Sequence, residues 1–335
     1  MIKIGIIGFG YWGPNLVRNF MNIEGCFVSH ICDLDIKKLE IAKKLYPLIE
    51  ITSLVDKIFS NPDIDAIVIA TPVSTHYDLA LKAIESNKHI LVEKPLTDSI
   101  EKAKILGVKA KEKNKILMID HTYLYTPAIQ KIKELIDTNS LGKIQYIDST
   151  RINLGLFQTD VNVMWDLAVH DIAICCYLLN EKPISVQATG ISHTENGLEN
   201  MAYITLHYAT KKIIHFNCSW VSPVKIRYML IGGDKKMIVF NDLETTEKIK
   251  IYDSSYENKY DPEHTKKFLT DYRIGDIFIP KIQQIEGLKN MAEDFINSIQ
   301  KSTEPISNFD LGLTIVNILE SAQKSIKNNG VKVNL

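Results

Sequence analysis

The stretch IKIGIIGFGYWG, residues 2–13, decides the class of fold. It begins as an apolar run of strand length and then places Gly8, Gly10 and Gly13 in the pattern G-x-G-x-x-G, directly before a helical pattern. In this context the three glycines make a tight turn, let the backbone approach a pyrophosphate, and let the helix pack on the strand. The stretch therefore predicts a dinucleotide-binding loop. The alternative is a glycine-rich turn that holds no ligand.

Strands and helices alternate around this loop through the first 120 residues. Short runs rich in Val and Ile are predicted to be strands: 2–7, 27–32, 66–70, 89–92 and 116–119. Amphipathic helical patterns separate them. Alternation of this kind favours a parallel sheet with helices on both faces, and continuous apolar strands agree with burial on both sides. The prediction is an α/β protein with an N-terminal Rossmann dinucleotide-binding domain.

The second predicted strand ends at Asp33, twenty residues after Gly13. This is the usual place for the carboxylate that binds the ribose hydroxyls of the adenosine. A carboxylate repels the 2′-phosphate of NADP, so the predicted cofactor is NAD. Lys37 and Lys38 follow closely and soften that preference.

The pattern changes after about residue 120. A helix is predicted over 126–138, and strand-like runs then follow one another closely: 143–152, 184–192, 201–208, 212–221, 225–231 and 236–240. Such runs predict a large, mostly antiparallel sheet. One helix interrupts them, Met164 to Leu179, and two more close the chain over 283–300 and 310–328. The expected domains are 1–121, which binds the dinucleotide, and 122–335, an α+β domain for substrate and oligomerisation. The polar segment 241–282 supports no assignment.

Composition narrows the class of protein. Charged residues make up 24% of the chain and the net charge is −1, so nucleic acid is not an expected partner. Five cysteines without a C-x-x-C spacing indicate neither a disulfide framework nor a zinc site, and fit a reducing interior. The apolar N-terminus is too short and too rich in glycine for a signal peptide or a membrane span. The expected location is the cytoplasm, with no membrane partner.

The sequence VEKPL, residues 92–96, ends the strand predicted over 89–92. Ligands of open parallel sheets bind beyond the carboxyl ends of the strands, so Glu93 and Lys94 are expected on the same rim as the glycine loop. Pro95 biases Lys94 towards extended backbone, and the peptide bond between them can be cis. A lysine held there suits a cation that touches a substrate oxygen beside a nicotinamide. The alternative is a charged pair that merely ends a strand.

A second candidate motif is DLAVH, with Asp166 and His170 on one face of the predicted helix. A histidine with a near-neutral pKa is suited to take the proton of an alcohol, and the carboxylate can orient the histidine or hold the substrate. By itself such a pair is more often a solvated helix face or a satisfied buried histidine. A metal site is a poor interpretation because no third ligand is apparent.

Taken together, the glycine loop, IATPVSTHYDLA (69–80), EKP and the D-x-x-x-H helix resemble the glucose–fructose oxidoreductase/inositol dehydrogenase family over essentially the whole chain. The resemblance implies a catalytic set of Lys94, Asp166 and His170. It also implies that Thr71, Pro72 and His76 line the nicotinamide side. A dimer or tetramer is implied, since one sheet face commonly pairs subunits in that family.

Much of that family carries a glycine-rich run before the aspartate, whereas this chain has DVNVMW at 160–165. RINLGLFQTDVNVMWDLAVHD (151–171), DHTYLYTPA (120–128) and SWVSPVKIR (219–227) instead resemble nucleotide-sugar enzymes, including dehydrogenases that oxidise C3 of UDP-N-acetylglucosaminuronic acid. That resemblance implies this substrate.

The remaining candidates line the two binding sites. The sugar pocket is expected to include Tyr123, Arg151, Asn153, Gln158, Trp165, Lys225 and Arg227. The alternatives are surface charges for the basic residues and a core position for Trp165. Tyr11 and Trp12 either pack on the helix or cover the cofactor.

Three other functions stay open at this point. The first is an oxidoreductase of a free sugar or inositol, and the second is a keto-sugar reductase that runs the same chemistry backwards. The third is an NAD-binding sensor without turnover, against which the joint presence of EKP and D-x-x-x-H argues.

Overall fold

The structure is a computed structural model of the 335-residue chain, and it describes residues 1–155, 157–259 and 269–335. Contacts divide the chain into two compact units. Unit 1 comprises Met1–Thr126 and Ile285–Glu320, and unit 2 comprises Pro127–Gln284 and Ser321–Leu335. Residues 285–320 therefore return to unit 1 after unit 2 has begun, which the sequence does not indicate. The predicted domains, 1–121 and 122–335, are consecutive segments and place residues 285–320 in the second domain.

Unit 1 is built on a six-stranded sheet with the order β3-β2-β1-β4-β5-β6, and every pair of neighbours is parallel. The strands are β1 (Ile2–Ile7), β2 (Cys26–Cys32), β3 (Glu50–Thr52), β4 (Ala66–Ile69), β5 (His89–Glu93) and β6 (Leu117–Asp120). Strands β4 and β6 are buried throughout, as a sheet covered on both faces requires. The predicted parallel α/β domain is confirmed.

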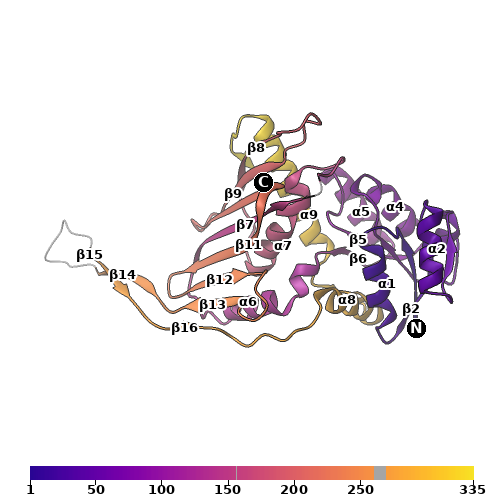
Figure 1. The fold of residues 1–335 in the computed structure, drawn as a ribbon, viewed down its shortest axis with the longest axis horizontal. Helices are drawn as coiled ribbons and strands as arrows, with labels where there is room; N and C mark the ends of the chain where they lie inside the picture. Colours follow the sequence, from indigo (N-terminus) through magenta and orange to yellow (C-terminus); the bar gives the residue numbers. More distant parts are fainter. Residues whose placement is uncertain (156, 260–268) are drawn as a thin grey trace. The chain divides into compact units, whose positions relative to one another are not determined.

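Helices connect these strands (Figure 1). They are α1 (Gly13–Met21), α2 (Ile36–Leu45), α3 (Asp56–Phe59), α4 (His76–Glu85) and α5 (Ile100–Glu112), with short 3₁₀ turns at Val73–Thr75 (η1) and Thr122–Tyr125 (η2). Helix α8 (Gly287–Lys301), much later in the chain, also belongs to this unit. The carboxylate of Asp35 caps α2 by accepting from the backbone N–H of Lys37 at 2.9 Å. Helix α8 packs on α1, where the rings of Phe20 and Phe295 meet edge to face at 6.2 Å.

Helix α9 (Phe309–Lys327) is divided between the units after Glu320. Its unit 1 part approaches α5 so closely that a Cβ on Gly107 would lie 2.0 Å from the ring of Phe309. Nearby, the Ser307 hydroxyl donates to the carbonyl of Ile119 at 2.6 Å. Residues 285–320 are thus part of the core of unit 1.

Unit 2 is built on a nine-stranded mixed sheet with the order β16-β13-β12-β11-β7-β10-β9-β8-β17. Its neighbours are antiparallel except for the pair β7 and β10, as predicted for a mostly antiparallel sheet. The strands are β7 (Ile144–Leu154), β8 (Ser185–Ile191), β9 (Met201–His207), β10 (Ile213–Ser219), β11 (Val221–Gly233), β12 (Met237–Asn241), β13 (Ile249–Tyr252), β16 (Ile277–Phe278) and β17 (Val333–Asn334). Helix α6 (Pro127–Asp137) and helix α7 (Val169–Leu178) complete the unit.

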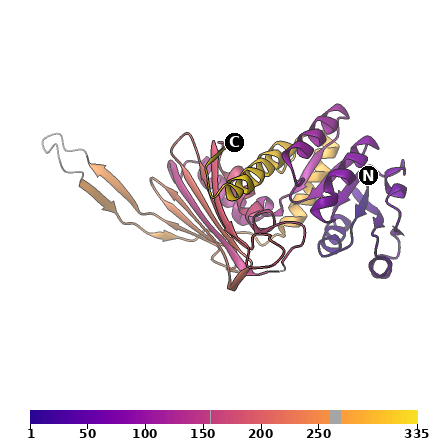
Figure 2. The ribbon, with the colours of Figure 1, turned by 90° about the horizontal axis from the view of Figure 1, so that it is seen from above.

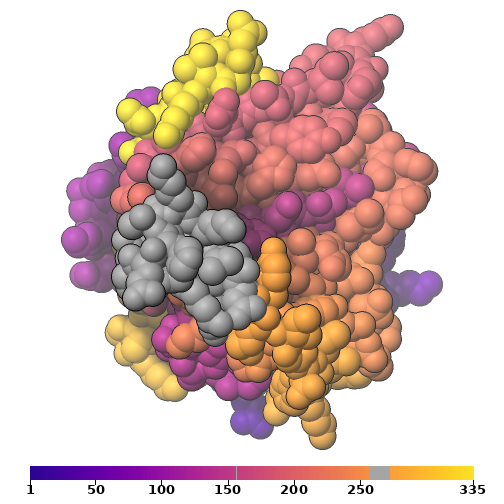
Figure 3. Space-filling view, turned by 90° about the vertical axis from the view of Figure 1, so that its left-hand side faces the viewer, coloured from indigo at the N-terminus to yellow at the C-terminus, as the bar shows by residue number. Residues whose placement is uncertain are grey.

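One face of this sheet is covered and the other is not. Burial alternates along β9, where Ala202, Ile204 and Leu206 have no exposed surface while Tyr203 is 40% exposed. Figure 3 looks onto the uncovered side, where the strands of the second half of the chain form a broad face. The Tyr203 ring stacks on that of His215 there, 5.8 Å away. Tyr203 and His215 thus put two stacked rings on the less buried side of the sheet.

The segment 241–282, for which no structure was predicted, contributes edge strands and a hairpin. Strands β14 (Ser255–Lys259) and β15 (Leu269–Arg273) pair with each other and not with the large sheet. Figures 1 and 2 show this hairpin extending away from the sheet. Residues 260–268 of this segment lie outside the described residues. In the part of the chain that the structure describes, no helix is both long and apolar enough to cross a membrane.

Candidate active site

The predicted residues of unit 1 all follow the carboxyl ends of its parallel strands. They comprise the glycine loop after β1, Asp33 after β2, Thr71 and Pro72 after β4, Glu93 and Lys94 at the end of β5, and Tyr123 after β6. This is the edge at which open parallel sheets bind ligands.

At two positions of the loop, Gly8 and Gly13, any other residue would clash with the protein backbone. Gly8 has φ of +98°, and a Cβ there would lie 2.3 Å from the carbonyl oxygen of Ala70. A Cβ on Gly13 would lie 2.4 Å from the carbonyl oxygen of Gly8. Gly10 differs, because the nearest atom to its absent Cβ is the ammonium nitrogen of Lys38 at 4.0 Å. The open side of Gly10 fits the close approach of a pyrophosphate to the backbone.

The carboxylate of Asp33 ties the glycine loop to the end of β2. One oxygen accepts from the backbone N–H of Phe9 at 2.7 Å and the other from that of Asp35 at 2.8 Å. The Lys38 ammonium lies 4.0 Å away. Ionised carboxylates accept several hydrogen bonds, so this one can hold the loop and still receive ribose hydroxyls. Asp33 fits the predicted ribose contact, and Lys38 partly offsets its charge.

His76 joins the loops that follow β4 and β5. Its side chain has no exposed surface, and its ring nitrogens lie 2.9 Å from the carbonyl oxygen of Thr71 and 2.8 Å from that of Pro95. The Lys94–Pro95 peptide is cis. His76, which was predicted to line the nicotinamide side, is thus a buried residue that links the loop carrying Thr71 to the loop carrying Lys94.

The aromatic residues of the glycine loop do not pack under the helix. Tyr11 is 82% exposed and meets the ring of Trp12 edge to face at 5.4 Å. Of the two interpretations drawn from the sequence, helix packing is wrong for Tyr11 because its ring faces solvent. A cover over the cofactor stays a prediction.

The motif D-x-x-x-H lies at the start of a helix that differs from the predicted regular one. Residues Met164–Ala168 form a π-helical turn, η3, and α7 continues from Val169. Asp166 lies in the π turn and His170 in the first turn of α7. Single π turns often occur at functional sites.

Two contacts of unit 2 fix this turn, and neither is apparent from sequence. The Trp220 indole N–H donates to a carboxylate oxygen of Asp166 at 3.0 Å. Asn162 accepts from the backbone N–H of Met164 at 3.1 Å, and its amide donates to Glu199 at 2.7 Å and to Gln323. Both contacts join residues far apart in the chain, which periodicity does not reveal.

Arg151, a predicted residue of the sugar pocket, is buried and ion-paired. Its guanidinium makes a bidentate ion pair with Asp171, with contacts of 2.6, 3.0 and 3.1 Å, and its side chain is only 3% exposed. The pair fastens the first turn of α7 to β7, directly beside His170. Since the fork of the guanidinium already binds a carboxylate, Arg151 serves position here and not the capture of a substrate anion.

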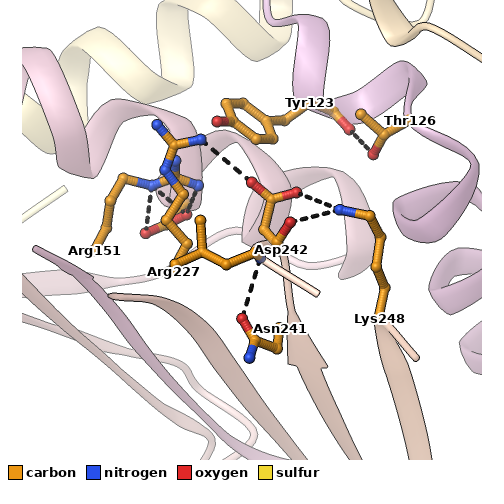
Figure 4. Close-up of polar contacts among 9 residues, drawn as sticks. Tyr123, Thr126, Arg151, Arg227, Asn241, Asp242 and Lys248 are labelled. Carbon is orange, nitrogen blue, oxygen red and sulfur yellow. Dashed lines mark hydrogen bonds and ion pairs between the residues drawn. The ribbon is translucent and has the colours of Figure 1, made fainter. Parts of the chain in front are cut away.

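Arg227 is more accessible and also has an acidic partner. It lies on β11 and contacts Asp242 at 3.3 Å, while the Lys248 ammonium contacts the same carboxylate at 3.3 Å (Figure 4). Lys225, two residues earlier, is exposed. Arg227 and Lys248 thus place two cations at one carboxylate, and both side chains are more exposed than that of Arg151.

The other candidates of unit 2 differ in exposure. Asn153 and Gln158 are half-buried, whereas Trp165 is buried and takes the core position that was its alternative. No group of three or more His, Cys, Asp or Glu side chains among the described residues is arranged to hold a metal ion.

Comparison with protein families identifies both halves of the chain. Residues 2–121 match the oxidoreductase family with an NAD-binding Rossmann fold, GFO_IDH_MocA, and residues 129–239 match the GFO/IDH/MocA C-terminal domain. The N-terminal unit is thus an NAD-binding Rossmann domain. The open side of Gly10 and the carboxylate of Asp33 agree with that cofactor.

Individual relatives span nearly the whole chain or most of it. The chain is 24% identical to scyllo-inositol 2-dehydrogenase (NADP(+)) of Bacillus subtilis, with 97% of this chain and 94% of that protein covered. It is 28% identical to UDP-N-acetylglucosamine 3-dehydrogenase of Acidithiobacillus ferrooxidans over 62% of this chain and 64% of that enzyme. An oxidoreductase from Agrobacterium radiobacter, solved with NAD+, L-tartaric acid and magnesium, has the same fold with a TM-score of 0.85, 16% identity and coverage of 99% and 98%.

Proposed function

The chain belongs to the Gfo/Idh/MocA family of oxidoreductases, and from that premise we propose that it oxidises a ring carbon of a nucleotide sugar, C3 of UDP-N-acetylglucosaminuronic acid. One observation carries the proposal: a chain with an NAD-binding Rossmann unit also has Lys94 directly after β5 and Asp166 and His170 on the turn η3–α7. A protein that only bound NAD would need neither motif.

The proposed chemistry assigns one task to each side chain. NAD, when bound, accepts a hydride at its nicotinamide. His170 takes the hydroxyl proton as general base. The Lys94 ammonium binds the same oxygen and stabilises its negative charge as the carbonyl forms. Asp166 accepts a hydrogen bond from the Trp220 indole and is proposed to orient His170 or to hold a neighbouring hydroxyl.

Support for a nucleotide sugar comes from the relative and from charge. UDP-N-acetylglucosamine 3-dehydrogenase is 28% identical over 62% of this chain. A UDP-uronate carries a pyrophosphate and a carboxylate, and Lys225 and Arg227 supply cations on one strand, β11. Arg151 does not support an anionic substrate, because its guanidinium is already paired with Asp171.

Inositol is the second candidate substrate. The relative that spans 97% of this chain is named a scyllo-inositol 2-dehydrogenase, and it uses NADP(+). A polyol carries no anionic group, so it would gain no ion pair from Lys225 or Arg227, whereas a UDP-uronate would.

Assembly and location complete the proposal. The uncovered sheet face with Tyr203 and His215 is the surface proposed to pair subunits in a homodimer or homotetramer. The proposed location is the cytoplasm.

The test is a substrate panel. The protein and NAD are incubated with UDP-N-acetylglucosaminuronic acid, UDP-N-acetylglucosamine, myo-inositol and glucose, and NADH is measured both free and enzyme-bound. The proposal expects reduction with the UDP-uronate first. Reduction with inositol or glucose alone would select the second candidate. Oxidation of NADH by a keto-sugar alone would indicate a reductase, and NAD binding without any turnover would indicate a sensor.

A further inference from the structure

The ends of β5 and β6 bring two buried carboxyl groups together. Glu93 and Asp120 are partners in the parallel register of these strands, whose backbones run about 4.8 Å apart. Both residues are buried, at 8% and 4% exposure. Lys94 follows Glu93 directly, so the two carboxyls lie at the root of the lysine proposed to bind the substrate oxygen.

Register partners on neighbouring strands direct their side chains to the same face of the sheet, so the two buried carboxyl groups lie side by side. Two ionised carboxylates in such a place repel each other, and a hydrogen bond between them requires one proton because ionised carboxylates only accept. Asp120 also accepts from the backbone N–H of Thr122 at 3.0 Å and from its hydroxyl, whereas Glu93 Oε1 has no partner among the described residues. Donors from Thr122 stabilise the charged form at Asp120, which leaves the proton on Glu93.

We propose that Glu93 and Asp120 share one proton in the resting protein and form a positioning pair that places one negative charge, and not two, beside Lys94. The shared proton itself follows from the contacts of the pair. Its effect on turnover rests on the proposed function of Lys94.

The surrounding charges agree with a single negative charge. Lys94 is the cation that faces both carboxyls. The ring of His121, buried next to Asp120, adds no positive charge because burial and then the nearby Lys94 lower its pKa to about 3. The Tyr125 hydroxyl faces Asp120 from the turn η2 but donates its proton to Asp294 at 2.7 Å. One ammonium thus balances one ionised carboxyl.

The titration of the pair follows from the same geometry. Burial, and then the charge of Asp120, raise the pKa of Glu93 well above its usual range, and Lys94 opposes this. Burial also raises the pKa of Asp120, against the donors of Thr122. The second ionisation is therefore displaced above the usual range of a carboxyl group. It adds a negative charge beside Lys94 and cancels part of the positive potential that a developing oxyanion needs.

The first test measures the proton without any substrate. The full-length protein at neutral pH should show an infrared carbonyl band of a protonated carboxyl, and ¹³C-glutamate labelling should shift it. Glu93→Gln should remove the band, and Asp120→Asn should shift its frequency because the carboxylate that accepts the proton is lost. Glu181→Gln should leave it, since Lys212 and Thr210 bind that carboxylate. A native protein without such a band, or a band that Asp120→Asn leaves unchanged, would overturn the proposal.

The second test measures the consequence for turnover. kcat/KM of the native enzyme should fall as pH rises through the ionisation of the second carboxyl, and Asp120→Asn should abolish that fall because only one negative charge can then form beside Lys94, while Glu181→Gln should leave it in place. A native profile without such a fall, or one that Asp120→Asn does not change, would refute the effect on Lys94. Absence of turnover with every sugar would refute the proposed function alone, because the infrared result stands without it.

Discussion

The indole N–H of Trp220 donates a 3.0 Å hydrogen bond to the carboxylate of Asp166, across 54 residues of sequence. The bond fixes one oxygen of a residue proposed to orient the base or hold the sugar. Trp220→Phe keeps an aromatic ring beside Phe157 and removes the donor. We expect kcat to fall about tenfold, since a hydrogen bond to a charged group contributes roughly 1.5–3 kcal/mol.

Steady-state kinetics and thermal melting check this expectation together. Phe157→Leu is the matched control, because it changes the packing on Trp220 and leaves the hydrogen bond intact. A Trp220→Phe enzyme with native kcat would show that the orientation of Asp166 does not depend on the indole.

Lys94→Ala and His170→Ala should each lower kcat by about 10²-fold or more, the range of positioned acid–base groups. Affinity for NAD should stay nearly native in both, since neither supplies the glycine loop or the ribose carboxylate. Calorimetry gives the affinity and single-turnover kinetics give the rate. Near-native turnover of either variant would remove that residue from the proposed chemistry.

Removing one partner of the ion pair between Arg151 and Asp171 should destabilise the protein by about 3–5 kcal/mol, because a buried charge is left without compensation. Arg151→Met and Asp171→Leu made together should cost less than the sum of the two single changes. Urea unfolding measures all three variants. Additive losses would mean that the pair contributes no coupling.

Native protein should bind NAD more tightly than NADP, since the carboxylate of Asp33 accepts ribose hydroxyls and repels a 2′-phosphate. Asp33→Ser should reduce the ratio of the affinities for NAD and NADP by about tenfold or more, as measured by calorimetry at fixed salt. Asp35→Asn is the control, as it keeps the helix cap and leaves Asp33 unchanged. Equal native affinities for the two cofactors would contradict the prediction.

Glu93→Gln should raise the stability of the protein at neutral pH. The folded-state pKa of Glu93 is raised by burial, so its share of stability is fully present below the unfolded pKa, about 4.3, and is lost as pH rises through the folded value. Glutamine does not titrate and avoids that loss. The melting temperature of the variant relative to native should increase from acid to neutral pH, by about 2–4 °C for each kcal/mol. A constant difference across pH would argue against a protonated Glu93.

Local patterns in the sequence predict the strands and the residues that follow directly at their ends. The apolar run 89–92 predicts that Lys94 follows a strand, and the glycine spacing predicts the loop after β1. The three-residue strand β3 escapes prediction because so short a run shows no period. The π turn at Met164 escapes for a similar reason, since its side chains follow the same apolar pattern as a regular helix.

Partners across the fold are beyond such patterns. A buried arginine and a substrate-binding arginine look alike in sequence, and only the fold shows that Arg151 meets Asp171. Asp120 ends a strand as Glu93 does, but their pairing depends on the order of the strands in the sheet. Periodicity shows that α8 has a buried face and does not show that α1 covers it.

The return of residues 285–320 to unit 1 has a consequence for biosynthesis. When the ribosome has released the first 126 residues, Phe20 still lacks Phe295, and Ile119 still lacks Ser307. The Rossmann unit of the nascent chain therefore cannot complete its core until most of unit 2 has been synthesised. A fragment that ends at residue 121 should be prone to aggregation and depend on chaperones. A fragment that joins residues 285–320 to it through a short linker contains the missing core residues.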